Sequence, residues 1–204
     1  MVASPARRRL TPQVRREQIL DETARIILDE GMSAVSMEGV ARGANISKGL
    51  VYAYFPNRTD LLSALLLREN GHFQEHGRRA LAEAGSFEES IRATTSAYLQ
   101  HVAERGPLID RLMNEPDIAR AMEQVDARDR QLTAAYFGHQ IAREFGLGES
   151  FSASVAELLM GLSGAAGNHV RKTDADREQT LDLVCTMLFA ALRAVAETHR
   201  KSAS

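Results

Sequence analysis

The stretch that most constrains the fold runs from Ser36 to Phe55 and reads SMEGVARGANISKGLVYAYF. Its apolar residues recur at helical spacing in two short segments and can close over one another: Met37, Val40, Ala41, Ile46, Leu50 or Val51, and Phe55. Asn45 lies in the turn between the segments, and asparagine tolerates a left-handed backbone at modest cost. Ser47 then predicts an N-cap for the second helix. Two helices this short need a third behind them, and residues 14–29 supply it.

The second short helix has an outer surface that is poorly suited to burial. It carries one base, two small residues and two phenols: Lys48, Gly49, Ala53, Tyr52 and Tyr54. Such a surface favours close approach to a polyanion, so this helix is a candidate recognition helix for the major groove of DNA.

The same run resembles the DNA-binding signature of the tetracycline-repressor (TetR) family, and the resemblance covers roughly the first third of the chain. The matching residues are Val40, Ala41, Ala44, Ser47, Lys48, Gly49, Tyr52, Tyr54 and Phe55, followed by Pro56, Asn57, Asp60, Leu61 and Leu62. Three positions depart from the family pattern. Asn45 stands where the family usually has a turn glycine, and Leu50 stands where it usually has a small hydroxyl residue. Gly39 occupies a position that is often acidic. The departures indicate local tuning of the site.

The whole chain predicts an all-α fold, because no stretch shows sustained strand alternation with turn signals. Helices are expected from about Thr11 to Gly31, from Pro56 to about His76 and from Ser86 to about Val102, the last ended by Gly106 and Pro107. Further helices are expected at 108–113, from Pro116 to Gly146, at 151–170, and from Asp174 or Asp176 onward. We expect an N-terminal three-helix DNA-binding unit with a helix-turn-helix, joined to a larger C-terminal helical domain for ligand binding and dimerisation. The expected divisions are a flexible basic arm at 1–10, the DNA-binding domain at 11–56 and the C-terminal domain at 57–200.

Composition excludes several classes of protein. Apolar residues make up 44% and charged residues 25%, as in ordinary globular chains. No apolar run is expected to be long enough to span a bilayer, and the N-terminus lacks the apolar core of a signal peptide. The single cysteine, Cys185, excludes an internal disulfide framework and fits a reducing compartment. These features predict a cytoplasmic protein with no membrane partner.

Charge is distributed unevenly although the total is only −2. Residues 1–60 carry nine Lys or Arg against seven Asp or Glu, whereas the remainder carries 16 against 20. Arg7, Arg8 and Arg9 stand directly ahead of the three-helix unit, with Arg15 and Arg16 close behind. This basic arm can reach phosphates or the minor groove, or it can be a merely solubilising tail.

The last two helices carry a long apolar pattern that favours self-association. The residues at alternating steps of three and four are Leu181, Val184, Cys185, Leu188, Leu192 and Val195, and the preceding helix carries a stripe of small residues at Gly161, Gly164, Ala165 and Asn168. The pattern fits either an internal core contact or a four-helix interface between two copies. The family resemblance implies the second, a homodimer that matches a palindromic operator.

The middle helices contain aromatic residues and methionines that are candidates for lining a cavity: Phe73, Tyr98, Met113, Met122, Tyr136, Phe137 and Met160. Such residues at helical spacing are more often plain core. The resemblance implies that this region binds a small-molecule effector, and several apolar side chains together indicate an apolar or amphipathic ligand.

No pattern indicates catalysis or a cofactor. His72 and His76 have an acceptable spacing for metal ligands beside Glu69 or Glu75, but the chain lacks an HExxH pattern and has one cysteine. It also lacks a nucleophile elbow and a glycine-rich phosphate loop. We therefore predict no enzyme, no metal site and no cofactor.

The sequence as a whole predicts a ligand-responsive, homodimeric transcriptional regulator, most simply a repressor, that binds double-stranded operator DNA. Tyr52, Tyr54, Arg58 and the arginine arm are expected to contact phosphates, with the caps Ser36 and Ser47 at the same surface. Lys48, Gly49, Leu50, Ala53 and Glu38 are expected to face base edges, although Glu38 can instead pair with Arg42. The alternatives are a regulator whose C-terminal domain only dimerises or binds a protein partner, and a helical metal protein.

Overall fold

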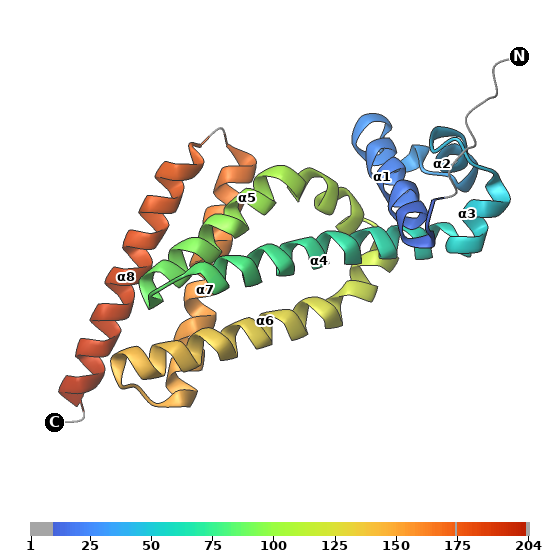
Figure 1. Ribbon diagram of the computed structural model, residues 1–204. Coiled ribbons are helices and arrows are strands. Elements are labelled where there is room, and N and C mark those ends of the chain that lie inside the picture. Colours follow the sequence, from blue (N-terminus) through green and yellow to red (C-terminus); the bar gives the residue numbers. More distant parts are fainter. Residues whose placement is uncertain (1–9, 174, 203–204) are drawn as a thin grey trace, which may run out of the picture. The chain divides into compact units, whose positions relative to one another are not determined.

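The computed structural model describes residues 10–173 and 175–202, and within these ranges it contains helices and no strand (Figure 1). The elements are α1 (Pro12–Glu30), the short 3₁₀ turn η1 (Met32–Ala34), α2 (Met37–Gly43), α3 (Lys48–Tyr54), α4 (Arg58–Glu83), α5 (Phe87–Met113), α6 (Pro116–Phe145), α7 (Glu149–Lys172) and α8 (Arg177–Ser202). The predicted all-α fold is confirmed.

The chain forms two compact units. The first comprises residues up to Arg68 together with Leu108–Ala119, and the second comprises Glu69–Pro107 and the chain from Arg120 onward. This division falls inside α4 rather than at the expected position between residues 56 and 57, because the start of α4 packs with the helices before it.

The first unit is built around α1, whose two ends are set by local chemistry. The Thr11 hydroxyl accepts a hydrogen bond from the Val14 amide at 3.3 Å, and Pro12 occupies the first turn. At the other end Gly31 leaves the helix with φ of 93°. The inner face of α1 joins a buried core shared by the first unit's helices: Ile19, Leu20, Ile27, Val40, Val51, Phe55, Leu61, Leu62 and Leu65.

The connection between α2 and α3 is a tight turn, as the sequence predicts. Asn45 has φ of 52° and is the sole non-glycine residue with positive φ in the described part of the chain. Its neighbour Ile46 donates its amide to the Ala41 carbonyl at 2.9 Å, which closes the end of α2. The helix-turn-helix geometry therefore depends on one left-handed residue.

Three long side chains fasten the first unit by binding backbone carbonyls. Gln18 donates its Nε2 to the Ala44 carbonyl at 2.7 Å and so ties α1 to the turn after α2. Arg58 and Arg111 do the same elsewhere: Arg58 binds the carbonyls of Met32 and Val35, and Arg111 those of Ile27 and Leu28. These carbonyls lie at or beside helix ends, where intrahelical partners are missing.

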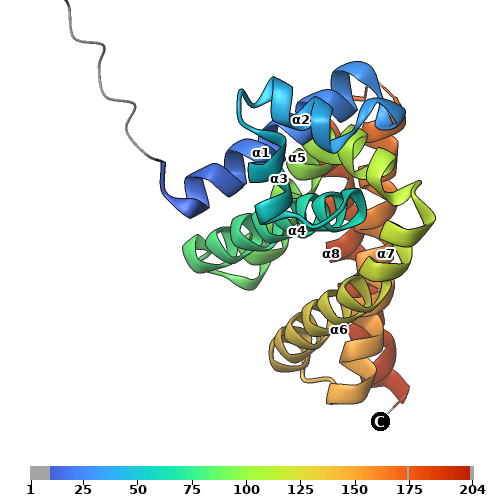
Figure 2. The ribbon, with the colours of Figure 1, turned by 90° about the vertical axis from the view of Figure 1, so that its right-hand side faces the viewer.

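The second unit has its core where α5, α6, α7 and α8 meet. Its central cluster contains Ile91, Ile141, Leu147, Val155, Ala156, Val184, Leu188 and Leu192. α7 and α8 form a hairpin and run side by side in both views (Figures 1 and 2). α6 and α7 approach closely at Gly138, where a β-carbon would lie only 2.8 Å from Cα of Ala153. Gly138 therefore permits the α6–α7 contact.

The structure corrects the expected break in α5. Gly106 and Pro107 were expected to end one helix before another at 108–113, but α5 continues through both residues from Phe87 to Met113. A proline within a helix removes one backbone hydrogen bond and costs about 3 kcal/mol. Burial of Leu99 on one side of the proline and of Leu108 and Leu112 on the other offsets that cost.

α8 is more apolar than the sequence analysis allowed. Within Arg177–Lys201 it reaches a mean hydropathy of 1.4, so that by length and composition alone it resembles a membrane span. The statement that no run is long enough was therefore wrong. Core helices of soluble proteins can have the same length and composition, and 39% of the most apolar 18-residue window of α8 is buried within the structure.

Candidate nucleic-acid interface and ligand cavity

The outer face of α3 is open to solvent. Lys48, Gly49, Tyr52 and Ala53 are exposed, whereas Leu50 and Tyr54 are half-buried. On the inner side Val51 is fully buried, and it anchors the helix to the core. The seven-residue helix is thus held by one side and presents a base, a phenol and two small residues on the other.

Lys48 connects the two helices at this surface. Its Nζ forms an ion pair with the Glu38 carboxylate of α2 and lies 5.6 Å from the centre of the Tyr52 ring. The hydrogen bond with Lys48 lowers the pKa of Glu38, and the same bond raises the pKa of Lys48. Glu38 therefore pairs with Lys48 and not with Arg42, the partner that the sequence suggested.

The predicted serines have structural roles at the same surface. The Ser36 hydroxyl accepts from the Gly39 amide at 3.0 Å, and the Ser47 hydroxyl accepts from the Leu50 amide at 3.2 Å. Both hydroxyls cap a helix and stay exposed beside the recognition surface.

Arg58 is engaged within the first unit. Besides binding the carbonyls of Met32 and Val35, its guanidinium pairs with Glu115 at 3.2 Å. A side chain held by three partners is not free to reach a phosphate, so the expected phosphate contact of Arg58 is not supported. The arginine arm, Arg7, Arg8 and Arg9, lies outside the described residues.

The second unit contains a large open cavity of about 1280 Å³. Residues of α4, α5, α6, α7 and α8 line it, among them Asn70, Phe73, Tyr98, Asp126, Asp129, Phe137, Ile141, Met160 and Leu188. Phe73 and Tyr98 form one aromatic wall, with their rings in an edge contact at 5.9 Å. The size and the mixture of apolar and polar lining suit a small organic molecule.

Four of the seven predicted cavity residues line it: Phe73, Tyr98, Phe137 and Met160. The other three do not. Met113 belongs to the first unit and Met122 is buried elsewhere. The exposed Tyr136 forms a T-shaped pair with Phe137, with the ring centres 5.1 Å apart. On α6, helical periodicity does not distinguish residues that line the cavity from residues that do not, because this helix has apolar residues on several faces.

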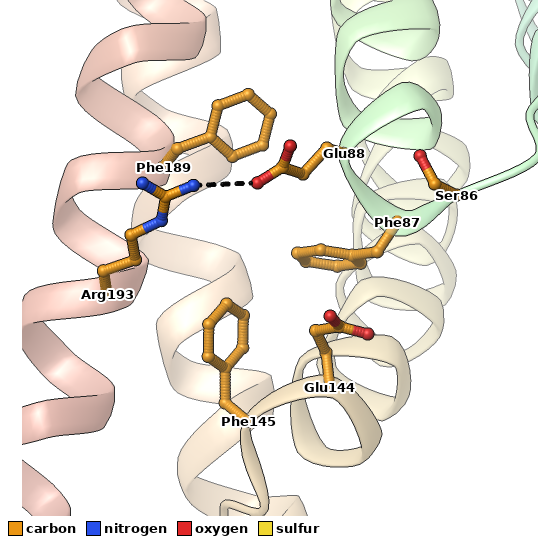
Figure 3. Close-up of a pocket in the computed structure, with 7 residues that line it drawn as sticks. All are labelled: Ser86, Phe87, Glu88, Glu144, Phe145, Phe189 and Arg193. Carbon is orange, nitrogen blue, oxygen red and sulfur yellow. Dashed lines mark hydrogen bonds and ion pairs between the residues drawn. The ribbon is translucent and has the colours of Figure 1, made fainter.

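A second, smaller cavity of about 380 Å³ lies where the start of α5, the end of α6 and α8 meet (Figure 3). Phe87, Phe145 and Phe189 surround it, and an ion pair between Arg193 and Glu88 at 3.0 Å lies at its edge. This cavity could not be predicted from the sequence, because its residues come from three distant segments.

The structure corrects the residues expected at the dimer interface. Leu181, Val184, Cys185, Leu188 and Leu192 are each at most 3% exposed, and Val195 packs against the same core. These side chains already face their own unit and cannot also face a second copy. The apolar pattern of α8 therefore marks the internal core contact, the plainer of the two explanations.

The solvent-exposed faces of α7 and α8 carry a second pattern, of which only the small residues on α7 were predicted from the sequence. Exposed residues again recur at steps of three and four: Phe151, Ser154, Leu158, Gly161, Ala165 and Asn168 on α7, and Leu183, Met187, Ala190 and Ala194 on α8. We call them the outer stripes. Leu158 is 77% exposed and Leu183 is 62% exposed, which is unusual for leucine. Gly161 and Gly164 were both predicted at an interface. Gly161 lies in the outer stripes, and both glycines, together with Ser154 of the outer stripes, also line the large cavity.

Within the described residues no group of three or more His, Cys, Asp or Glu is arranged to hold a metal ion. Cys185 is a free, buried thiol, and burial raises its pKa.

Comparison with known proteins agrees with this arrangement. Residues 19–65 match the model of the family described as bacterial regulatory proteins, tetR family. The chain is 26% identical over 187 residues to the HTH-type transcriptional activator FasR of Mycolicibacterium smegmatis, a match that covers 89% of this chain and 84% of the relative. It is 31% identical over 115 residues to the HTH-type transcriptional repressor KstR of the same organism, covering 55% of this chain and 56% of the relative.

A solved structure shows the same fold over nearly the whole chain. It is that of a TetR-like transcriptional regulator from Rhodococcus sp. RHA1, with a TM-score of 0.67 at 23% identity, covering 91% of this chain and 99% of that one. These relatives are regulators of transcription and not enzymes. The helix-turn-helix at residues 36–55 lies inside the stretch that matches the family model, and together these similarities support a DNA-binding transcriptional regulator of the TetR family.

Proposed function

We propose that the protein is a homodimeric, sequence-specific repressor that a small apolar or amphipathic ligand releases from a palindromic operator. The observation that carries this proposal is the exposed face of α3, held from behind by the buried Val51. Its relatives include one protein named an activator and one named a repressor, so the direction of control belongs to the proposal. Such a regulator acts in the cytoplasm.

At the operator, Lys48 donates to guanine acceptors while Ala53 and Leu50 pack against thymine methyl groups. Tyr52 and Tyr54 contact phosphates, together with the arginine arm, and fix the register of the helix in the groove. Because the surface offers few hydroxyl donors, much of its sequence preference comes from apolar contact.

Dimerisation uses the outer stripes of α7 and α8. Two copies of this hairpin, each with exposed apolar and small residues at alternating steps of three and four, form a four-helix interface by close packing. The small residues Gly161, Ala165, Ala190 and Ala194 permit close approach, and Leu158, Leu183 and Met187 supply the buried area. A two-fold symmetric pair then matches two half-sites.

The effector binds in the large cavity. α4 is one continuous helix whose residues 58–68 belong to the DNA-binding unit and whose Asn70, Phe73 and Gln74 line the cavity. A ligand that binds the protein more tightly with α4 in one position than in another favours the first position. The population of dimers competent to bind DNA then shifts by an amount set by the difference between the two affinities.

The dimer is tested by sedimentation of purified protein. We expect a dimer for wild type, a monomer for Leu158→Glu with Leu183→Glu, and a dimer for Leu132→Glu, because Leu132 is 59% exposed but lies on α6. A dimeric double variant contradicts the proposed interface. If the double variant is monomeric and no longer protects both halves of an inverted repeat, the palindrome is supported.

The role of the cavity is tested separately by a thermal-shift screen of small molecules followed by release of operator DNA. A protein that binds DNA but is stabilised by no compound is the alternative, a regulator whose C-terminal unit only dimerises or binds a protein partner.

A further inference from the structure

We infer that the effector is a single-chain amphiphile with a neutral or cationic head group, and not a free carboxylate such as a fatty acid. The inference rests on the proposed effector function and deepens it. It follows from the different chemistry of two parts of the large cavity's lining.

The charged side chains of the cavity lining carry an excess of negative charge, and three of the four lie close together on α6. Among the lining residues that the structure describes, three are carboxylates and one is a guanidinium: Asp126, Asp129, Glu157 and Arg130. Asp129 accepts a hydrogen bond from the Asn70 amide at 2.8 Å, which fixes its carboxylate across α4 and α6. The formal charge of the lining is therefore −2.

Asp126 is the carboxylate of this lining whose pKa is shifted by burial. It is half-buried, and burial raises its pKa despite the opposing attraction of Arg130, while Asp129 raises it further. A ligand cation placed here restores the lost solvation, and a ligand hydroxyl donates a hydrogen bond to the carboxylate. A ligand carboxylate adds repulsion to the same site.

Another part of the lining is apolar and continuous with the core. Ile91, Ile141 and Leu188 line the cavity and belong to the central cluster, with Phe137 and Leu159 packed against it. Along α6, Ile141 follows Arg130 by eleven residues, which corresponds to about 16 Å at the rise of an α-helix. A linear alkyl chain bridges this distance, whereas a compact polar molecule leaves the apolar part unfilled.

The head-group preference is tested with three probes that share a decyl chain: decyltrimethylammonium, decanol and decanoate, each titrated below its micellar concentration against full-length protein by calorimetry. Wild type should bind the ammonium probe at least about tenfold more tightly than decanoate, a ratio of the size that one partly buried charge pair produces. Decanol should fall between them.

The charges are tested with Asp126→Asn combined with Asp129→Asn, which brings the lining to a formal charge of zero. The ammonium-to-decanoate ratio should fall at least about fivefold, while decanol binding persists and shows that the cavity is folded. Glu123→Gln removes an exposed carboxylate of α6 outside the cavity and should leave the ratio unchanged.

Three outcomes overturn the inference: decanoate binding as tightly as the ammonium probe, no binding by any of the three probes, or a ratio that the double variant does not change. The proposed function fails in a different way. If the ammonium probe binds as expected but does not release operator DNA, the cavity chemistry stands and the regulatory role of the cavity is lost.

Discussion

Lys48, the first residue of α3, forms an ion pair with Glu38 of α2, so two residues predicted to face base edges neutralise each other in the free protein. Both side chains are more than half exposed. An exposed ion pair of this kind contributes little to the stability of the protein, so its main effect is on the recognition of DNA. Binding to DNA requires Lys48 to exchange Glu38 for a base or a phosphate, or to carry Glu38 with it to a neighbouring cytosine.

Glu38→Gln should therefore strengthen binding to non-specific DNA several-fold at moderate salt and reduce discrimination between operator and non-specific DNA, because Lys48 is released and a negative charge is removed. Titration of both duplexes by fluorescence anisotropy measures the change. Glu30→Gln, at the exposed end of α1, makes the same change in net charge. Equal effects of the two variants contradict a specific role for the pair.

Gly49→Ala should separate stability from DNA binding. A β-carbon at Gly49 meets no atom within 4 Å, so the substitution should raise the free energy of unfolding by about 0.5–1 kcal/mol through better helix propensity. If DNA approaches α3 as proposed, the added methyl group should weaken operator binding. Gly71→Ala on α4 also meets open space and should stabilise without affecting DNA binding. Unchanged DNA binding by Gly49→Ala indicates that DNA does not approach this position.

Asn45→Ala should destabilise the protein by about 1 kcal/mol, because alanine resists the left-handed conformation at φ of 52°. Asn45→Gly should stay within about 0.5 kcal/mol of wild type, since glycine adopts this conformation freely. Chemical unfolding of both variants measures the difference. Equal stability of the two variants rules out backbone conformation as the reason for asparagine in this turn.

His101 should make the protein less stable in mild acid. Burial lowers its pKa below 6.5, while Glu69 partly opposes the shift and Arg105 adds to it. The unfolded chain then binds the proton more strongly, so this contribution to stability is complete above pH 6.5 and is lost as pH falls through the window below it. His101→Gln should lose less stability than wild type between pH 7 and pH 5. The exposed His72→Gln is the control, and an unchanged pH dependence in His101→Gln contradicts the assignment.

Local signals in the sequence predicted local structure well. Ser36 and Ser47 cap the helices that they were expected to cap, α1 begins beside Thr11 as expected, and Asn45 adopts the left-handed turn. In each case the chemistry of one residue and its near neighbours decides the geometry.

The partner of an apolar face was harder to predict. The periodicity of α8 identifies a face that includes Leu181 and Leu188, but it cannot say whether that face meets its own chain or a second copy. Burial of both residues within the protomer decides the question, and it moves the proposed interface to Leu158 and Leu183. The continuation of α5 through Pro107 was also hard to predict, because the tertiary packing of the helix outweighed the local tendency of proline to end it.

The central claim is that the outer face of α3 binds the operator. The most direct measurement is a salt-dependent gel shift of Tyr52→Ala on the region upstream of the protein's own gene, with dimerisation checked by sedimentation. We predict loss of the shift with an intact dimer, because Tyr52 is 41% exposed on this face and supports no part of the core. Wild-type binding by Tyr52→Ala would contradict the assignment of this surface.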